Sequence, residues 1–545
     1  MTHEKYGNEV TLNPPPDLQL KDFDEIFNDG KNLGYLPEKV KRDPDPERGP
    51  PGAMHRKLKE RQLTMMSIGG TIGTGLFLGM GSSLNDGGPM GLLLGYLIMG
   101  TVVCSVQMAL GEMITYMPCH GALTTFPARF VDPALGFSVG WNYWYSFAIC
   151  VAGEVTAAAI VVDYWKAPVN QGVWITIFFL TACAINFFGV KCYGEVKSSL
   201  ESYFHQAVFI DPAVKVFAIT SLVVLGLVLN LGGGPTHEFI GLKYWKDPGL
   251  FRQLNDIPGA TGRFLAFWSV FIQAAYSFLG TETVALAAAE TENPRKTVPR
   301  AIRTVFYRLL LFYVASAFVI GIVVPFNDPQ LLGGTGDASS SPFVIAINRS
   351  KIKILPDFIN AVVLVSAYSA TSSEVYCGSR VLHGLVIDGM APKIFGKVNS
   401  SGNPVNALVA SAIPGLLAYM NLSEKSSSVF LWLVNISAMG GIFTWWSVCL
   451  TYIRFHKGLK ARGVDRDSFD YKAPFQPYLS YYGVVMLAAI ILMSGFKVFL
   501  KGQWSWGSFI GAYITLPIFA FTYLFWKIYH KTKLVRIDQM DFSVP

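Results

Sequence analysis

Apolar residues along the chain gather in long blocks, and polar residues collect in the stretches between them. Each block reaches about 20 residues, the length that an α-helix needs to cross the hydrocarbon core of a bilayer. Hydropathy therefore predicts an all-α integral membrane protein with about twelve transmembrane helices. The blocks begin near Leu63, Gly91, Phe137, Val173, Val214, Phe264, Ile302, Ile359, Val405, Val429, Tyr481 and Trp506.

The stretch before the first block has a different character. Residues 1–60 are rich in proline and in both charges and too poor in apolar side chains to bury a core, so we expect a largely disordered N-terminal tail. The stretch also lacks the apolar core of a signal peptide, so the first span must act as its own insertion signal. We expect residues 61–530 to form one transmembrane domain and residues 531–545 a short C-terminal tail.

Glycine interrupts the first span. Ser67-Ile-Gly-Gly-Thr-Ile-Gly-Thr-Gly-Leu-Phe-Leu-Gly79 holds five glycines among thirteen residues. Each glycine weakens a helix by roughly 0.5 to 1 kcal/mol relative to alanine. The sixth span is interrupted as well, by the small and polar residues of Ala274-Ala-Tyr-Ser-Phe-Leu-Gly-Thr-Glu-Thr283. Two interrupted spans, five positions apart, are typical of transporters built from inverted repeats.

An unwound backbone at Gly69–Gly75 would free amide groups at mid-membrane depth, where each unpaired group costs several kcal/mol. A ligand carboxylate can satisfy those amides, and the positive end of the following half-helix favours an anion. Thr71 and Thr74 offer additional hydroxyl donors. The first break therefore predicts a binding site for a carboxylate.

Two other interpretations of the glycines stay open. Glycines four residues apart also let helices pack closely, and Gly69/Gly73 and Gly75/Gly79 have that spacing. The second interrupted span favours the binding site over this packing role. A phosphate-binding loop is the weakest interpretation, because the segment lacks the preceding strand that such a loop requires.

Ionisable side chains within spans are costly and point to function. Glu154 in the third span is a candidate for sensing a substrate ammonium or carrying a coupling proton, although a protonated glutamate bonded to a neighbouring helix explains it equally well. Glu282, where the sixth span resumes, is favoured as a pathway residue over a structural cap. Glu112 and Glu290 lie near span ends, where water can solvate them, so we expect gates or packing partners there. Ser369-Ala-Thr-Ser-Ser-Glu374 offers hydroxyls to a ligand or to its own helix carbonyls.

Composition agrees with the membrane assignment and excludes several classes. The 545 residues are 51% hydrophobic and only 15% charged. The net charge of +7 comes from basic residues in alternate loops, which places both termini in the cytoplasm and carries no nucleic-acid signature. The seven cysteines have no CxxC spacing, so neither a zinc site nor a disulfide framework is expected. No nucleophile–base constellation, metal-ligand cluster or Walker-type loop is found, so we expect neither an enzyme nor a cofactor.

Several motifs in order, from about Lys57 to the C-terminus, resemble the fungal amino-acid permeases of the amino acid-polyamine-cation (APC) superfamily. They are Ser67-Ile-Gly-Gly-Thr-Ile-Gly-Thr-Gly-Leu-Phe77, Leu110-Gly-Glu-Met113, Arg129-Phe-Val-Asp-Pro-Ala-Leu-Gly-Phe137, Gly140-Trp-Asn-Tyr-Trp-Tyr145, Gly280-Thr-Glu282 and Glu292-Asn-Pro-Arg-Lys296. Four further segments make the chain most similar to the dicarboxylic amino-acid permeases of this family. These are Gly232-Gly-Gly-Pro235, Ser341-Pro-Phe-Val-Ile-Ala-Ile347, Ala391-Pro-Lys-Ile-Phe395 and Tyr452-Ile-Arg-Phe-His-Lys-Gly-Leu-Lys460.

The resemblance implies a LeuT-like fold of five plus five inverted spans followed by two more, with the amino acid held between broken spans one and six. The substrate carboxylate would then meet the backbone amides around Gly70, Thr71, Gly73, Thr74 and Gly75. The substrate ammonium would face carbonyls near Ser67 and Ile68 and near Tyr276, Ser277 and Leu279. Protons would be the coupling ion, with Glu154, Glu282 and Lys215 as candidate carriers.

The fifth span departs from the family pattern. The family has a lysine here that is thought to take part in proton coupling or to replace a sodium ion, and Lys215 matches it. The preceding segment, 196–213, is longer than the pattern and lacks its Glu-Phe-Trp core. Asp211-Pro212 reads as an N-cap followed by a first-turn proline, which predicts a helix restart and places Lys215 near an aqueous end. A gene-model error and a genuine kinked segment both explain the extra residues.

The resemblance implies a proton symporter that imports amino acids, with glutamate and aspartate as first substrates, at a plasma membrane. A neutral or broad-range permease is the alternative, because the sequence identifies no cationic pocket for an acidic side chain. A transceptor, which binds amino acids and signals without transport, is disfavoured because no large signalling tail is seen. Lysines of the N-terminal tail are candidate sites for a ubiquitin ligase, namely Lys5, Lys21, Lys31, Lys39 and Lys41.

Overall fold

A computed structural model describes most of the chain beyond residue 70. The described residues are 71–119, 121–165, 168–195, 200–286, 294–332, 341–399, 403–422 and 426–543. They belong to one compact unit, Arg42–Pro545. Every regular element among them is a helix, which confirms the predicted all-α class. Residues 1–60, for which a disordered tail is expected, lie outside the described residues.

The helices follow the order of the apolar blocks. The first half of the chain contributes η1 (Gly75–Gly79), α3 (Met80–Tyr116), α4 (Ala122–Phe130), α5 (Pro133–Asp163), α6 (Gln171–Glu195), α7 (Leu200–Asn230), α8 (Lys243–Lys246), η2 (Leu254–Asp256), α9 (Gly259–Trp268), α10 (Val270–Phe278) and α11 (Thr283–Leu286). The second half contributes α12 (Pro294–Val323), α13 (Pro329–Leu332), α14 (Pro342–Arg349), α15 (Leu355–Ile387), η5 (Lys393–Gly396), α16 (Val405–Ala412), η6 (Ile413–Leu422), α17 (Ser426–Ala461), η7 (Arg466–Ser468), α18 (Tyr478–Met493), η8 (Phe496–Phe499), α19 (Trp506–Tyr513), α20 (Thr515–Tyr529) and η9 (Ile537–Gln539).

Helical structure is found in each of the twelve apolar blocks within the described residues. By length and hydropathy alone, eight of the described helices can cross a membrane, or up to nine when the bent pair α19 and α20 counts as one span. That number treats Gly75–Tyr116 as a single helix. The backbone at Gly88 leaves the helical conformation (φ 71°) directly before Pro89, so this stretch contains the end of one span and all of the next.

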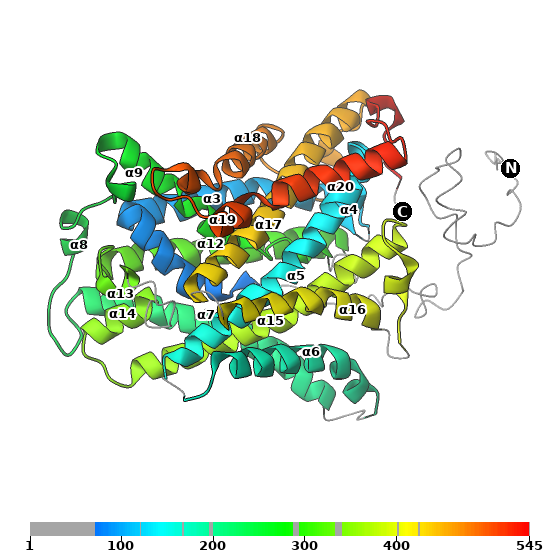
Figure 1. Ribbon diagram of the computed structural model, residues 1–545. Helices are drawn as coiled ribbons and strands as arrows, with labels where there is room; N and C mark the ends of the chain where they lie inside the picture. The colour runs from blue at the N-terminus through cyan, green and yellow to red at the C-terminus, as the bar shows by residue number, and fades with distance from the viewer. Residues whose placement is uncertain are drawn as a thin grey trace, which may run out of the picture. The chain divides into compact units, whose positions relative to one another are not determined.

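Helix α5 lies at the centre of the bundle. It begins sharply, because the Asp132 side chain accepts a hydrogen bond from the amide of Ala134 (2.9 Å) and Pro133 occupies the first helical position. Its membrane-spanning window is 94% buried, against 33% for the peripheral helix α18. α15, α17, α4 and α20 pack directly on α5. Figure 1 shows the long helices side by side, with α8, α9, α13 and α14 at one end of the bundle and α4 and the C-terminus at the other.

The course of helix α7 contradicts the prediction made for the fifth span. It begins at Leu200 and continues without interruption through Asp211 and Pro212, so the predicted restart at that pair is wrong. Lys215 is only 1% exposed, so its side chain is buried among neighbouring helices and is not solvated. An internal proline removes one backbone donor, which a helix packed among other membrane helices tolerates. Residues 196–199 lie outside the described residues, and the origin of the long segment is untested.

Candidate functional site

The first span is unwound at its glycines. Ile72 and Gly73 bend out of the helix, and a short wide turn, η1, leads into α3. Side chains from three other segments hold the backbone carbonyls of this stretch. Tyr313 on α12 donates to the Thr71 carbonyl (3.3 Å), Ser366 on α15 to the Ile72 carbonyl (3.1 Å) and Ser341 before α14 to the Phe77 carbonyl (3.0 Å).

These bonds fix an irregular backbone within the bundle, which is tolerated where it is buried in protein or lines a cavity. The predicted break in the first span is therefore confirmed from Thr71 onward. Ser67, Ile68 and Gly70, the other predicted site residues of this span, lie outside the described residues.

The sixth span is broken at the predicted place. α10 ends at Phe278, Leu279 is extended (φ −57°, ψ 143°), and α11 starts at Thr283. Gly280 has a positive φ of 91°, a conformation that other residues rarely adopt. The side chain of Leu279 turns away from the break and packs against Gly441 of α17.

The two breaks touch. A Cβ atom added to Gly75 would lie 3.0 Å from the Cα atom of Ser277 and 3.0 Å from the Tyr276 ring. A close approach of this kind is what glycine allows and a larger residue prevents. Gly75 therefore allows the two broken spans to come into contact, whereas Gly73 leaves space for a different neighbour.

Gly73 makes room for Glu154. A Cβ atom added to Gly73 would lie 2.9 Å from the Glu154 Oε1 atom. Oε1 accepts hydrogen bonds from the Thr74 hydroxyl of the first break (3.0 Å) and from the Tyr276 hydroxyl of the second (3.0 Å). The side chain is 3% exposed, and no described residue donates to Oε2. A single carboxylate from α5 thus joins both broken spans and keeps one oxygen unsatisfied.

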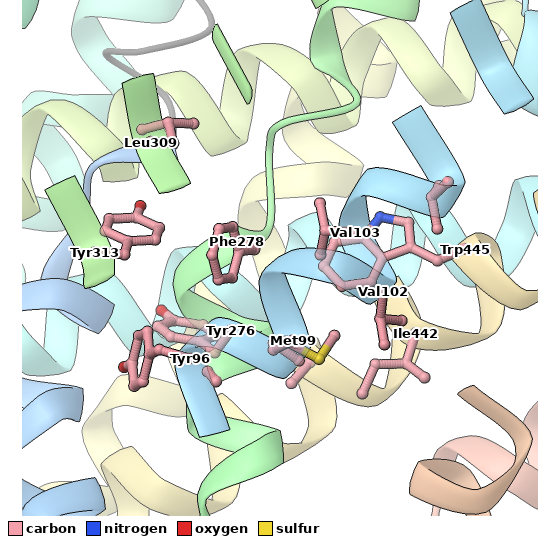
Figure 2. Packing of buried hydrophobic residues seen from close by; sticks show 14 of the residues in the cluster. Tyr96, Met99, Val102, Val103, Tyr276, Phe278, Leu309, Tyr313, Ile442 and Trp445 are labelled. Atoms are coloured by element: carbon pink, nitrogen blue, oxygen red, sulfur yellow. The ribbon is translucent and has the colours of Figure 1, made fainter. Parts of the chain in front are cut away.

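Three aromatic rings form a wall beside the break. Figure 2 shows Tyr96, Phe278 and Tyr313 grouped where α10 ends. The ring centroids of Phe278 and Tyr313 are 4.8 Å apart, and Tyr96 lies 6.5 Å from Phe278 and 6.4 Å from Tyr313. The hydroxyl groups of Tyr96 and Ser277 are hydrogen-bonded at 3.0 Å. The Tyr313 ring meets both other rings edge-to-face, and these contacts fix the side chains next to the break.

Lys215 reaches the same region from α7. Its Nζ atom donates to the Ser369 hydroxyl on α15 at 2.7 Å. Ser369 lies one helical turn beyond Ser366, which holds the Ile72 carbonyl. The lysine also interacts electrostatically with Glu154 and Glu374. The structure therefore brings Lys215 to the broken first span and gives one hydroxyl of the Ser369–Glu374 stretch a partner.

Glu282 belongs to a separate network. Its carboxylate accepts hydrogen bonds from the Tyr143 hydroxyl of α5 (3.1 Å) and from the Thr281 hydroxyl (3.3 Å). Gln107 of α3 donates to Thr281 at 2.9 Å, and Glu282 is 1% exposed. None of these bonds reaches Glu154.

Glu112 is not solvated, contrary to the sequence-based expectation. It is 0% exposed, and its two oxygens accept hydrogen bonds from the Arg466 guanidinium at 2.7 and 2.8 Å. The amide of Ala473 donates to it at 2.8 Å. A bidentate partner compensates for the loss of water, so Glu112 has the role of a packing partner. Glu290 lies outside the described residues.

Glu374 is an intramembrane carboxylate whose importance the sequence analysis missed. It lies in the middle of α15, and its Oε2 atom is buried with no hydrogen-bond partner among the described residues. The rule that flagged Glu154 and Glu282, a charge inside a span, applies equally to Glu374. The adjacent run of serine and threonine drew attention to hydroxyls instead.

Comparison with known proteins gives a consistent result. A model of the amino acid permease family matches residues 62–539. The chain is 40% identical over 494 residues to the dicarboxylic amino acid permease of Saccharomyces cerevisiae, covering 90% of this chain and 79% of that protein. It is also 40% identical over 497 residues to the proline-specific permease of Emericella nidulans, with coverages of 90% and 88%. The general amino-acid permease GAP2 of Candida albicans is 38% identical over 538 residues, with coverages of 98% and 88%.

Among solved structures, the manganese transporter of Eremococcus coleocola matches with a TM-score of 0.51 at 14% identity, covering 88% of this chain and 97% of that one. That likeness concerns the fold alone. The curated relatives are named as permeases, so the prediction of a transporter and not an enzyme is confirmed. By its family match and its relatives, the chain is a multi-pass membrane protein that belongs to the amino acid permease family.

Proposed function

We propose that the protein imports amino acids together with protons, and that the amino acid binds where the two broken spans meet. The observation that supports this most strongly is the Glu154 carboxylate, which already lies against both breaks with hydroxyl groups from Thr74 and Tyr276 on one oxygen. Hydroxyl donors fixed at both breaks suit a substrate carboxylate when Glu154 is protonated, because two adjacent carboxylates would repel each other.

In this proposal the substrate carboxylate binds the amides around Gly70, Thr71, Gly73, Thr74 and Gly75. The ammonium faces carbonyls near Ser67 and Ile68 and, on the second break, near Tyr276, Ser277 and Leu279. Those last residues end α10, whose carbonyl end carries the negative part of the helix dipole and therefore favours a cation. The Tyr96–Phe278–Tyr313 wall excludes water from one side.

Proton coupling follows from the charge balance of the site. Lys215 interacts electrostatically with Glu154 and Glu374, and Glu374 interacts with Glu282 as well, so among these described residues three carboxylates stand against one lysine. Buried charges without compensation are unfavourable, so loading an anion there requires a proton. We therefore assign proton uptake first to Glu154, with Lys215 and Glu282 as further participants.

Glutamate and aspartate are our first candidate substrates, because an acidic side chain adds negative charge and makes the need for protons strongest. A neutral or broad-range substrate set is the second candidate, and the excess of carboxylates over cations around the breaks favours it. Relatives at similar identity are named for dicarboxylic amino acids, proline and lysine, so identity does not separate these options. A plasma-membrane location with both termini in the cytoplasm, and ubiquitin attachment at the N-terminal tail, complete the proposal.

The test is uptake of labelled glutamate at acidic and neutral external pH in cells that lack their own amino-acid permeases. We expect acid-stimulated uptake that excess aspartate blocks and excess leucine spares. Inhibition by leucine would indicate the broad-range alternative. Binding of labelled amino acid by surface-localised protein without accumulation would contradict import and indicate a transceptor.

A further inference from the structure

The carboxylate of Glu374 lies on a face of α15 that leads away from the first break. Ala370, Glu374 and Gly378 are four residues apart and therefore share that face. The Ala370 Cβ atom would lie 3.6 Å from a Cβ atom on Gly73, at the level of Glu154. At the other end of the face, a Cβ atom on Gly378 would lie 3.5 Å from the Phe147 Cβ atom of α5. Glu374 is between these two levels.

The face of α5 opposite α15 carries residues at the same successive heights along the bundle axis. Glu154, Cys150, Phe147 and Tyr143 follow each other at helical spacing, each about one turn or 5.4 Å further along the axis. Tyr143 donates to Glu282 at the last level. The order along the bundle is thus Glu154, then Glu374, then Glu282 with Tyr143.

Glu374 interacts electrostatically with both of the other carboxylates. Glu154 and Glu282, in contrast, are bonded to different hydroxyl groups and share no described partner. The titratable and charged groups that act on or are acted on by Glu374 are Tyr143, Cys150 and Glu154 of α5, Lys215 of α7 and Glu282 beyond α10. Within the described chain, no three acidic, histidine or cysteine side chains are arranged to hold a metal ion.

We propose that Glu374 relays the coupling proton between Glu154 and Glu282. This inference rests on the proposed function, since it needs a proton to travel with the amino acid. The carboxyl groups of Glu154 and Glu374 are not hydrogen-bonded to each other in the described arrangement, so a side-chain rotation or a bridging water has to close the gap before transfer. The O–H bond at Glu154 then breaks as one forms at Glu374, and the same exchange moves the proton to Glu282. One proton changes place at each step, so Glu374 returns to its starting charge, Glu154 becomes a carboxylate, and Glu282 holds the proton until it releases it. The unsatisfied oxygens of Glu154 and Glu374 are the atoms that receive the proton and give it up.

The decisive variant is Glu374→Gln in the full chain, with Val365→Ala, an exposed residue of the same helix, as the matched control. Labelled glutamate and labelled leucine are used in parallel in permease-deficient cells, and surface amount is measured for each variant. Two quantities are compared: accumulation driven by a pH gradient, and exchange of internal for external amino acid at equal pH. Exchange needs substrate binding and movement of the carrier but no net proton release.

We expect Glu374→Gln to lower gradient-driven accumulation on the order of tenfold and to abolish its acid stimulation, while exchange stays within about twofold of wild type. Glu374→Asp, which keeps the titratable group, should restore part of the acid stimulation, and Val365→Ala should match wild type. Retained acid stimulation in Glu374→Gln would overturn the relay. Loss of exchange together with accumulation at normal surface amount would overturn it too, because the residue would then serve binding or packing. Failure of the proton symport itself would be visible earlier, as absence of acid stimulation in the wild type.

Discussion

Buried carboxylates differ in how completely they are hydrogen-bonded at the two breaks and at the C-terminal end of the bundle. Near the breaks, Glu154 and Glu374 each keep an oxygen without a hydrogen-bond partner among the described residues. At the other end, Glu112 is fully paired with Arg466 and the Ala473 amide. A satisfied polar network stabilises one arrangement, whereas an unsatisfied buried group is costly and persists where function uses it. The comparison indicates which end of the molecule does the transport chemistry and which end holds the helices in place.

A second set of contacts lies at the same end of the bundle as the Glu112–Arg466 pair. We call it the C-terminal clamp; it consists of Thr532–Ser543 and the residues that bind this segment. The Val535 amide donates to the Val131 carbonyl (2.9 Å), and Arg129 donates to the Ser543 carbonyl (2.9 Å). Arg454 joins the carbonyls of Phe130 and Val535, and Arg462 donates to that of Met540. Thr532 and Lys527 both contact Asp132, the N-cap of α5. The clamp therefore ties the end of the chain to α4, α5 and α17.

Aromatic contacts close the clamp. The Phe542 ring lies 5.1 Å from Phe130 of α4, 5.7 Å from Phe455 of α17 and 6.1 Å from Tyr116 of α3, measured between centroids. The Arg462 guanidinium lies 4.8 Å from the same centroid. One ring thus contacts α3 and α4 from the first half of the chain and α17 from the second.

The largest effect is expected from filling the space at the first break. Gly73→Val would place side-chain atoms where the Glu154 carboxylate lies, 2.9 Å from the Cβ position, and should lower uptake about a hundredfold or more at normal surface amount. Gly384→Val on α15 is the matched control, because nothing lies within 4 Å of its Cβ position. Uptake of labelled glutamate and leucine, corrected for surface protein, measures both. Normal transport by the Gly73 variant would show that the breaks are not the site.

The second effect concerns stability, at the opposite end. Arg466→Ala leaves the fully buried Glu112 unpaired, which should cost about 3 kcal/mol or more and lower the thermal unfolding temperature of the purified protein by several degrees. Lys472→Ala, in the same connection, removes an exposed ion pair with Asp467 that water screens, and should leave the unfolding temperature close to that of wild type. Equal shifts for the two variants would contradict the comparison between buried and exposed pairs. The double variant Glu112→Leu/Arg466→Met should recover most of the loss, since it removes both charges together.

Removing the aromatic contact of the clamp should have a smaller effect. Phe542→Ala deletes a partly buried ring and should destabilise the protein by about 1 to 2 kcal/mol. Leu534→Ala is the control in the same segment, because that side chain is 57% exposed. Unfolding temperature and the rate of proteolysis at α4 measure the result. Exchange of amino acid should change less than stability, because no contact of Phe542 reaches the breaks; a larger loss of exchange than of stability would count against this separation.

Sequence predicted the helices and both breaks because the signals are local. Apolar length specifies a span, and glycine or small polar residues within it specify an interruption. The pairings at the site are not local: Glu154 lies 80 residues from Thr74 and 122 from Tyr276, and Arg466 lies 354 from Glu112. No spacing rule links such positions, so the sequence suggested Glu154 without its partners.

The wrong prediction of a helix restart before Lys215 has a different cause: a strong local signal was present, but packing outweighed it. Asp211-Pro212 is a strong local signal for the start of a helix, yet α7 continues through it and buries the lysine against Ser369. Packing among neighbouring helices outweighed the local preference. Glu374, in turn, was visible as a charge within a span, but only the arrangement of α15 against α5 gives it a place between the other carboxylates.

The smallest effect is expected from Asp388, the first residue after α15. Burial raises the pKa of this carboxyl to about 6, against the opposing effects of the Thr124 hydroxyl, which donates to it at 3.1 Å, and of Arg129. The folded protein therefore holds a proton on Asp388 that the unfolded chain releases near pH 4, so this group lowers stability as the pH rises from about 4 to about 6. Above pH 6 the loss is complete and constant.

Asp388→Asn keeps an oxygen that accepts from Thr124 and removes the charge. A pKa rise of this size corresponds to roughly 3 kcal/mol, and partial exposure of the side chain reduces the expected gain to about 1 kcal/mol. The variant should therefore unfold about 2 °C higher than wild type at pH 7.5 and at the same temperature at pH 4. Thermal unfolding of both proteins across that range measures the difference. A gain that is the same at both pH values would show that the substitution acts through packing and not through the charge.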